Sequence, residues 1–109
     1  MSEREQEQDR RKGKRVSVQL WVKERDPDGV YYNHATNLSS GGMYLERAIP
    51  HPVGTEVELH FTLPDESEPI VARARIVNAA VESMGMGLAF VDLAPEVLER
   101  IEKFVGKSG

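Results

Sequence analysis

Apolar and polar residues alternate along several short stretches of the chain, and the first of these begins at Val16. From Val16 to Lys23 every second side chain is aliphatic, with serine, glutamine, tryptophan and lysine between them. Side chains of a strand point alternately to its two faces, so this pattern predicts a half-buried strand. The turn-forming residues Asp26–Gly29 follow, and Val30–Tyr32 resumes the strand pattern. The two segments are therefore predicted to pair as a hairpin.

The same period recurs in the middle of the chain, where turn residues separate each alternating stretch from the next. Pro50–Gly54 marks a loop and Pro64–Ser67 a turn. The further strands predicted are Met43–Leu45, Glu56–Leu63, Ile70–Ile76 and Met86–Phe90. The glycines of Gly85–Gly87 lie inside the last of these patterns, which indicates a bulge or a close backbone approach. Repeated short strands with polar turns predict an antiparallel barrel or sandwich.

The period changes near the end of the chain. From Val97 to Val105 the apolar residues recur at helical spacing, and Pro95 suits a first helical turn, where its missing N–H costs nothing. Gly106 is predicted to stop the helix. A helix of roughly three turns is too short to be stable alone, so we expect it to pack on the barrel or on a partner.

Length and composition restrict the class of protein. The 109 residues suffice for one domain with a hydrophobic core, but not for a second domain or a large catalytic cleft. The absence of cysteine excludes disulfides and thiolate metal sites. No apolar run approaches the roughly 20 residues that span a bilayer, and the N-terminus lacks the apolar core of a secretory signal. We therefore expect a cytoplasmic protein without membrane insertion, and a flexible tail at residues 1–9.

Positive charge is concentrated near the N-terminus of an otherwise acidic chain. The net charge is −4, yet residues 1–15 carry six basic and four acidic side chains. The rest of the chain holds eight basic and fourteen acidic side chains. A protein that binds a long nucleic acid spreads positive charge over a whole face of its fold. The observed distribution favours a small, compact anion instead, and no nucleic acid polymer is expected as a partner.

No arrangement of residues typical of an enzyme is recognisable. His34, His51 and His60 are spaced by 17 and then 9 residues, which matches no metal-binding signature. Ser39 and Ser40 lie beside glycines but lack the strand–turn–helix context of a catalytic serine. We therefore expect no catalytic residues, no metal and no cofactor. His60, on the polar side of its predicted strand, is expected to be exposed to solvent.

Five cationic side chains occur within the six residues Arg10–Arg15. A basic tail exposed to solvent is one explanation. The other is an anion clamp, because guanidinium groups form paired hydrogen bonds with phosphate oxygens or with the O6/N7 edge of guanine, and stack on base planes. Arg11 and Arg15 are four residues apart, so together they could reach two sides of one ligand, and Gly13 lets the segment wrap around it.

A second polar segment, Asn37–Gly42, separates two predicted strands. Asparagine and serine stabilise turns, and the paired glycines Gly41 and Gly42 allow positive φ, so a tight turn is one explanation. The same residues suit a loop that reads a base, since an amide both donates and accepts hydrogen bonds and glycine permits a ligand to approach closely. Taken alone, the segment is compatible with both interpretations.

Together the two segments resemble a known family. Arg11-x-x-x-Arg15, a following hairpin, and then Asn37-x-Ser39-x-x-Gly42 is similar to the arrangement in PilZ domains, the receptors for the bacterial second messenger cyclic di-GMP. Each motif alone is common. Both motifs in this order, at this spacing and in a chain of this length and strand pattern, are considerably more specific.

The resemblance extends from about Arg10 to the C-terminal helix, and Gly87–Asp92 is similar to the last barrel strand of the family. It implies a fold that is all-β with one C-terminal helix, in which six antiparallel strands form a PilZ-type barrel. It also implies that residues 10–109 form the PilZ domain. This fold agrees with the alternating pattern described above.

The resemblance implies specific roles for five residues. Arg11 and Arg15 would bind phosphates and guanine edges of the ligand. Asn37 and Ser39 would contact a guanine, and Gly42 would shape the turn. The first position of the family's loop motif is Asp or Asn, and the asparagine here lacks the negative charge that accepts from two guanine N–H groups at once.

The expected function is that of a binding module. Arg10 directly precedes the arginine motif, and in similar proteins a basic residue there accompanies a stacked ligand dimer, so we expect two nucleotides per domain. Ligand binding would order the N-terminal arm and create a surface that an effector protein reads, in the control of motility, pili or exopolysaccharide. The protein is expected to be a monomer or a weak dimer.

Two other functions are compatible with the sequence. Some PilZ-like proteins no longer bind the nucleotide and act as adaptors through protein–protein contacts. The intact motifs here favour binding of the nucleotide. A weak nucleic-acid binder using the basic arm is less favoured because the rest of the chain is acidic.

Overall fold

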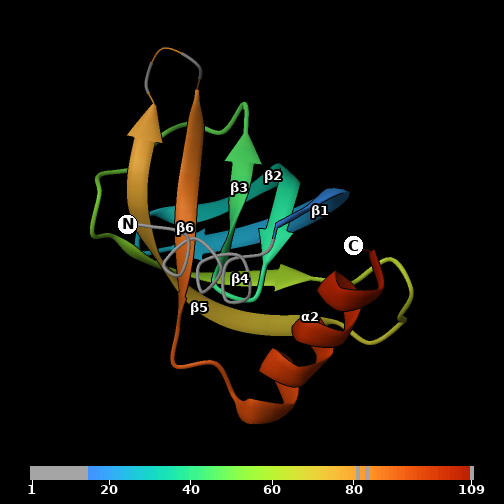
Figure 1. The fold of residues 1–109 in the computed structure, drawn as a ribbon. Helices are drawn as coiled ribbons and strands as arrows, with labels where there is room; N and C mark the ends of the chain where they lie inside the picture. The colour runs from blue at the N-terminus through green and yellow to red at the C-terminus, as the bar shows by residue number, and fades with distance from the viewer. Residues whose placement is uncertain (1–14, 81, 83, 109) are drawn as a thin grey trace, which may run out of the picture.

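The alternating stretches of the sequence form a closed barrel of six antiparallel strands, and a helix follows the last strand (Figure 1). The computed structural model describes residues 15–80, 82 and 84–108. The elements are β1 (Val16–Asp26), β2 (Gly29–Ser39), β3 (Gly42–Glu46), β4 (Glu56–Phe61), β5 (Ile70–Ala80), β6 (Gly85–Val91) and α2 (Pro95–Ser108). The expected all-β fold with one C-terminal helix is confirmed.

The strand order around the barrel is β1-β2-β3-β6-β5-β4. Hairpins join β1 to β2, β2 to β3, β4 to β5 and β5 to β6, because these neighbours are also consecutive along the chain. Two further pairings close the barrel, β3 with β6 and β1 with β4. Closure gives every strand a partner on each side, although β1 pairs with β4 only from Lys23 to Arg25. Paired edges are not available for aggregation with other sheets.

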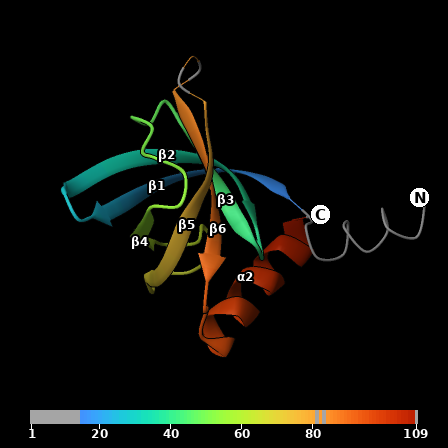
Figure 2. The same ribbon diagram turned by 90° about the vertical axis from the view of Figure 1, so that its left-hand side faces the viewer.

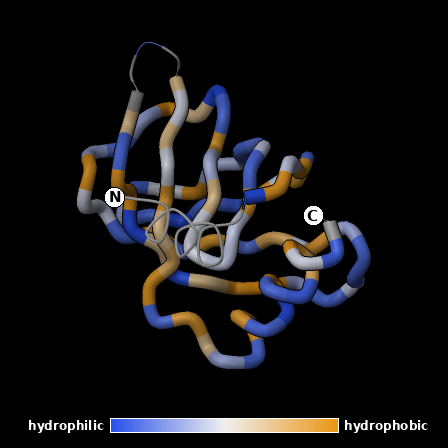
Figure 3. Tube along the Cα trace, in the orientation of Figure 1, coloured by the Kyte–Doolittle hydropathy of each residue, from blue (hydrophilic) through white to orange (hydrophobic). Residues whose placement is uncertain are grey.

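The inner faces of the strands supply the hydrophobic core, and Figure 3 shows the alternation of apolar and polar positions along them. Every aliphatic side chain that the alternation placed inward on β1 and on β5 is buried. The core residues of these two strands are Val16, Val18, Leu20, Val22, Ile70, Ala72, Ala74 and Ile76. On the outer face, Trp21 is 72% exposed, which matches its expected position.

The first hairpin is longer than the sequence pattern indicated. The alternation of β1 continues beyond Lys23, so that Glu24 and Asp26 also point inward and are buried. β2 runs without interruption to Ser39, so the expected break at residue 37 is wrong. The two carboxylates hid the continuation of the inner face, because a charged side chain at an inward position breaks the apolar pattern by which such a face is recognised.

The helix α2 packs against one end of the barrel, opposite the tip of the β1–β2 hairpin (Figure 2). Its apolar face buries Ile101 and Val105 in the core. Outside this contact, Arg100 donates to the Glu66 carboxylate at 2.8 Å, and Lys107 pairs with Asp65. These ion pairs tie the β4–β5 turn to the helix.

Gly106 does not stop the helix as expected, because α2 continues to Ser108. A glycine ends a helix by adopting positive φ, and among the described residues Gly54 is the glycine with that conformation. The ion pair of Lys107 supports the last turn, where a cation is also favoured by the partial negative charge of the helix C-terminus.

Candidate functional site

The register of the β1–β2 hairpin brings the arginine segment next to the polar segment. Val16 is opposite Leu38, and Ser17 is opposite Asn37. Arg15, one residue before the start of β1, is therefore placed at the level of Ser39, where β2 ends and the chain turns. Two segments that are more than twenty residues apart in sequence lie side by side because the strands between them form an antiparallel pair.

The polar segment is a strand end and a tight turn rather than a loop. The Ser39 hydroxyl accepts a hydrogen bond from the Gly41 N–H at 3.1 Å and donates to the Gly42 carbonyl oxygen at 3.4 Å. Neither Gly41 nor Gly42 has positive φ, so the expected reason for the paired glycines is wrong. Gly42 is required for another reason, since a Cβ there would overlap with the carbonyl oxygen of Leu88 on β6.

A pocket of about 280 Å³ lies where this turn meets the neighbouring strands. We call it the hairpin pocket. Its lining comprises Arg15, residues 37–39 and 41–44 of the β2–β3 hairpin, and residues 77–78 and 87–89 of β5 and β6. Four of the six residues expected to bind the ligand therefore share one pocket, namely Arg15, Asn37, Ser39 and Gly42.

Irregularities in the strands place two asparagine amides at this pocket. β2 has one more residue than β3 beside Asn37, and β5 has one more than β6 beside Asn78. A bulge of this kind shifts the alternation by one, so a side chain that strict alternation would bury is turned outward. Asn78 is exposed although it follows buried Ile76 by two positions, and its Oδ1 accepts from the Gly87 N–H at 3.1 Å.

The electrostatics of the pocket favour an anion. Among its described lining residues, Arg15 carries the formal charge, and no carboxylate is present. The polar groups that accompany it are amides, a hydroxyl, the phenol of Tyr44 and backbone of the turn. A guanidinium beside neutral donors and acceptors is a combination that recognises a phosphate together with a base edge.

Other residues of the expected site fall outside what the structure describes. Arg10 and Arg11 precede residue 15, as does the tail at residues 1–9. In the other direction, the structure adds Tyr44, Asn78 and Gly87 to the pocket. Tyr44 meets Gly87 because β3 pairs with β6, which is not its neighbour in the chain, and a bulge on β5 turns Asn78 outward. No pattern in the sequence reports either feature.

The glycines near the end of the chain are explained by close contacts, as expected. A Cβ on Gly85 would overlap with the Tyr44 hydroxyl, and one on Gly87 would lie 3.0–3.2 Å from the Asn78 amide.

No described histidine lines the hairpin pocket. His60 lies on the outer face of β4 beside Glu58, with Nε2 3.1 Å from the carboxylate, and its side chain is 29% exposed rather than fully solvated.

Comparison with known proteins identifies the family. The fold is a small closed barrel of six antiparallel strands with a C-terminal helix, and a polar hairpin turn and an arginine lie at one end of it. The family model described as PilZ domain matches residues 9–107. The chain therefore belongs to the PilZ domain family. A search of curated proteins finds no significant match.

Solved structures with the same fold include an inhibitor of motility and two PilZ domains. The inhibitor of motility MotI/DgrA of Bacillus subtilis matches with a TM-score of 0.71 at 18% identity, over 85% of this chain and 48% of that one. The PilZ domain of CeSA from a cellulose-synthesizing bacterium matches with a TM-score of 0.62 at 20% identity, over 85% and 91% of the two chains. This chain thus spans about half the length of the motility inhibitor.

The third structure is the PilZ domain of YcgR from Escherichia coli, solved with c-di-GMP. It matches with a TM-score of 0.70 at 14% identity, over 86% of this chain and 87% of that one. At these identities the likeness establishes the fold.

Within the described residues, no helix has the length and apolar character that a membrane crossing needs.

Proposed function

We propose that this chain is a cyclic di-GMP receptor that holds a guanine and an adjoining phosphate in the hairpin pocket. The observation that carries the proposal is the placement of Arg15 beside the turn of Asn37, Ser39 and Gly42, in a pocket whose described lining has no carboxylate. The c-di-GMP in the structure of the YcgR PilZ domain supports the same ligand class.

The proposed roles follow from exposure and existing hydrogen bonds. Arg15 is exposed, so its guanidinium is free to form paired hydrogen bonds with a phosphate or with the guanine O6/N7 edge. Asn37 is half-buried at the pocket wall, where its amide can bind the guanine edge. Ser39 is buried, and its hydroxyl already accepts a hydrogen bond within the turn, so its main role is to hold the turn in shape.

The size of the pocket limits what it can enclose. Pockets for complete small ligands measure about 300–1,000 Å³, and the 280 Å³ here accommodates part of a dinucleotide. We therefore assign the remainder of the ligand to Arg10 and Arg11. Arg11 precedes Arg15 by four residues, so the Cα atoms of the two arginines are at most about 14 Å apart. At that distance Arg11 can reach a nucleotide bound in the pocket. A second, stacked nucleotide would be held by the same arm.

Binding without turnover would make the protein a signalling module. The arm from Arg10 to Arg15 carries five positive charges, and ligand phosphates would neutralise part of this charge. Ordering the arm costs conformational entropy, which charge-assisted hydrogen bonds must exceed. The arm and barrel together would then form a surface for an effector protein in the cytoplasm. The fold shared with an inhibitor of motility supports motility as one such output.

Calorimetric titration of the full chain with cyclic di-GMP tests the proposal. We expect saturable binding that Arg15→Ala weakens about 10- to 100-fold, since hydrogen bonds to a charged group contribute about 1.5–3 kcal/mol. Arg25→Ala is the matched control, because Arg25 is also exposed but lies near the end of β1 that is far from Arg15. Circular dichroism would establish that both variants retain the fold.

Absence of binding to the wild-type chain would refute the receptor proposal and favour the adaptor function. Equal losses in Arg15→Ala and Arg25→Ala would refute the assignment of the pocket. A parallel titration with a single-stranded oligonucleotide distinguishes the third function, because a general nucleic-acid binder shows steep salt dependence and little preference for the cyclic dinucleotide.

A further inference from the structure

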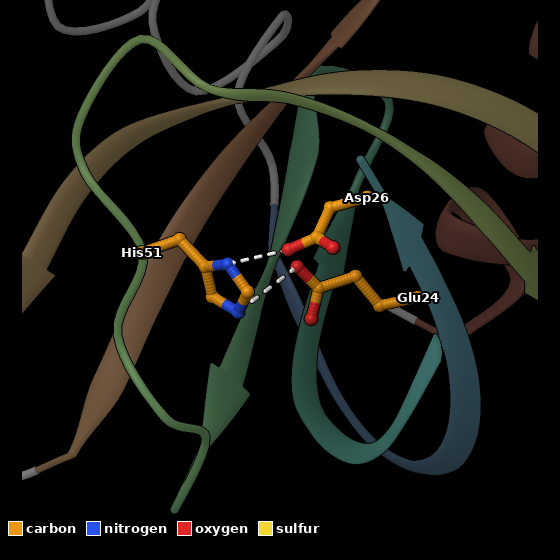
Figure 4. A group of neighbouring side chains, drawn as sticks. All are labelled: Glu24, Asp26 and His51. Carbon is orange, nitrogen blue, oxygen red and sulfur yellow. Dashed lines mark ion pairs between the residues drawn. The ribbon is translucent and has the colours of Figure 1, made fainter. Parts of the chain in front are cut away.

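A second group of polar side chains lies at the tip of the β1–β2 hairpin, at the other end of β1 from the hairpin pocket. Glu24 and Asp26 point inward from β1, and His51 reaches them from the segment between β3 and β4 (Figure 4). We call this group the carboxylate–histidine cluster. His51 Nδ1 lies 2.7 Å from Asp26 Oδ2, and His51 Nε2 lies 3.7 Å from Glu24 Oε2.

The cluster is buried. The side chains of Glu24 and Asp26 are 0% exposed, and that of His51 is 11% exposed. Taking a carboxylate out of water costs several kcal/mol unless a cation or a set of hydrogen bonds replaces the water. Two carboxylates facing one imidazole therefore require a specific source of positive charge or of protons.

Hydrogen bonds hold both carboxylates by their outer oxygen atoms. Asn33 Nδ2 donates to Glu24 Oε1 at 2.7 Å. The backbone N–H groups of Asp28 and Gly29 donate to Asp26 Oδ1 at 2.8 and 2.9 Å, which also fixes the hairpin turn. Each carboxylate is thus oriented by one oxygen while the other oxygen faces the imidazole.

The imidazole is also held in place by its surroundings. The backbone N–H of His51 donates to the Met86 sulfur at 3.4 Å, and the ring of Tyr31 meets the imidazole edge-on at a centroid distance of 5.0 Å. The orientation of all three side chains is therefore set by contacts outside the cluster. Such outer contacts are the usual means by which proteins orient metal ligands.

The inner atoms of the cluster have no hydrogen-bond partner. Among the described residues, Glu24 Oε2, Asp26 Oδ2 and His51 Nε2 are buried and without a hydrogen bond. His51 Nδ1 lies close to Asp26 Oδ2, but the geometry does not complete a hydrogen bond to that oxygen. Buried polar atoms that face one another and lack partners indicate a bound water or ion.

We propose that Glu24, Asp26 and His51 bind a divalent transition-metal ion, with Zn²⁺ as the preferred metal. One ligand atom from each residue lies within 4.8 Å of the others. Tetrahedral bonds of about 2.0–2.2 Å to zinc place the ligand atoms roughly 3.3–3.6 Å apart, so side-chain movements of about 1 Å complete the site. An imidazole among carboxylates selects zinc and its neighbours over Ca²⁺ and Mg²⁺, which prefer oxygen ligands throughout.

The proposed role of the metal is structural. It would fasten the segment of residues 47–55, which joins β3 to β4, onto the hairpin tip. The near-complete burial of the ligands leaves little room for a substrate. Glu24 is nine residues from Arg15, about 30 Å along β1, so the two sites are separate and either can fail without the other.

Metal binding is tested on untagged full-length protein stripped with a chelator. We expect Zn²⁺ to bind with one ion per chain by calorimetry, and to raise the unfolding temperature by about 10 °C when present at 100-fold its Kd. Co²⁺ in the same site is expected to give visible absorption bands of a low-coordinate complex. Neither result depends on cyclic di-GMP.

Variants assign the binding to these residues. His51→Ala and Glu24→Gln are expected to weaken Zn²⁺ binding more than 100-fold, and the glutamine preserves the oxygen that accepts from Asn33. His60→Ala is the matched control and is expected to keep full affinity, because His60 forms a similar contact with Glu58 on the outer face. The proposal is overturned if the wild-type chain binds no stoichiometric Zn²⁺, which would mean that protons complement the cluster, or if Glu24→Gln binds as tightly as the wild type.

Discussion

The two adjacent glycines of the β2–β3 turn are predicted to respond to alanine in opposite ways. A Cβ on Gly42 would overlap with the Leu88 carbonyl oxygen, and it would lie 2.9 Å from the Leu88 carbonyl carbon and 3.1 Å from the Ala89 Cα. All of these atoms belong to the backbone of β6, so no side-chain rotation relieves the overlap. β3 and β6 must separate at the point where Gly42 pairs with Ala89.

The magnitude follows from what the separation disrupts. Overpacking of a well-packed site costs about 1–3 kcal/mol. The neighbouring hydrogen bond from the Phe90 N–H to the Gly41 carbonyl oxygen is 2.8 Å long, and its loss adds about 0.5–1.5 kcal/mol. Gly42→Ala is therefore expected to reduce the free energy of unfolding by about 2–4 kcal/mol, and to lower the midpoint of thermal unfolding by about 10 °C or more.

Gly41 is the matched control. Among the described residues, a Cβ there would meet only the Ser39 hydroxyl oxygen, at an ordinary distance of 3.8 Å, and the backbone does not have positive φ. Because alanine restricts the unfolded chain more than glycine does, Gly41→Ala is expected to be neutral or to stabilise by up to about 1 kcal/mol. Urea denaturation of the two variants measures both effects. A Gly42→Ala variant within about 0.5 kcal/mol of the wild type, or equal losses in the two variants, would refute the reasoning.

Two further predictions concern the helix and the barrel surface. Ile101→Ala is expected to lower the free energy of unfolding by about 2–5 kcal/mol, because Ile101 is completely buried. Glu102 is exposed, so Glu102→Ala should change this free energy by less than about 0.5 kcal/mol. Similar midpoints of urea unfolding for the two variants would contradict the packing of α2. Hydrogen bonds from Arg73 and Arg75 hold the pKa of Glu56 below its ordinary value of 4.5. A lowered folded-state pKa stabilises the fold above the pKa of the unfolded chain, and this contribution is lost as the pH falls through the folded-state pKa. Glu56→Gln should therefore lose less stability than the wild type between neutral pH and about pH 3, and parallel pH profiles would argue against the prediction.

The candidate site was only partly predictable from the sequence. The motif residues Asn37, Ser39 and Gly42 were recognisable, and so was the hairpin that brings Arg15 to them, because both depend on local patterns. The reason for Gly42 was not, since it lies in the backbone of β6 and not in the turn. Asn78 was hidden too, because the bulge that turns it outward is set by its pairing with β6.

The carboxylate–histidine cluster was equally hidden. Its members Glu24 and Asp26 are close in sequence, but their inward orientation breaks the rule that charged residues face solvent. His51 comes from a separate segment, and its spacing from the other histidines carries no information about carboxylates on β1. Only the closure of the barrel brings the three side chains together.

The sequence by itself determined the existence and order of the strands, the apolar part of the faces they bury, the turns between most consecutive strands and the C-terminal helix, but not every boundary of these elements. These features follow from periods of two and of about 3.6 residues and from turn-forming residues, all of which act over a few positions. The tertiary structure decided the pairings of β3 with β6 and of β1 with β4, the bulges, and the neighbours of each buried polar atom. Those features depend on packing between segments far apart in the chain. There, the contribution of a residue to stability is set by the residues of the neighbouring strand that it contacts.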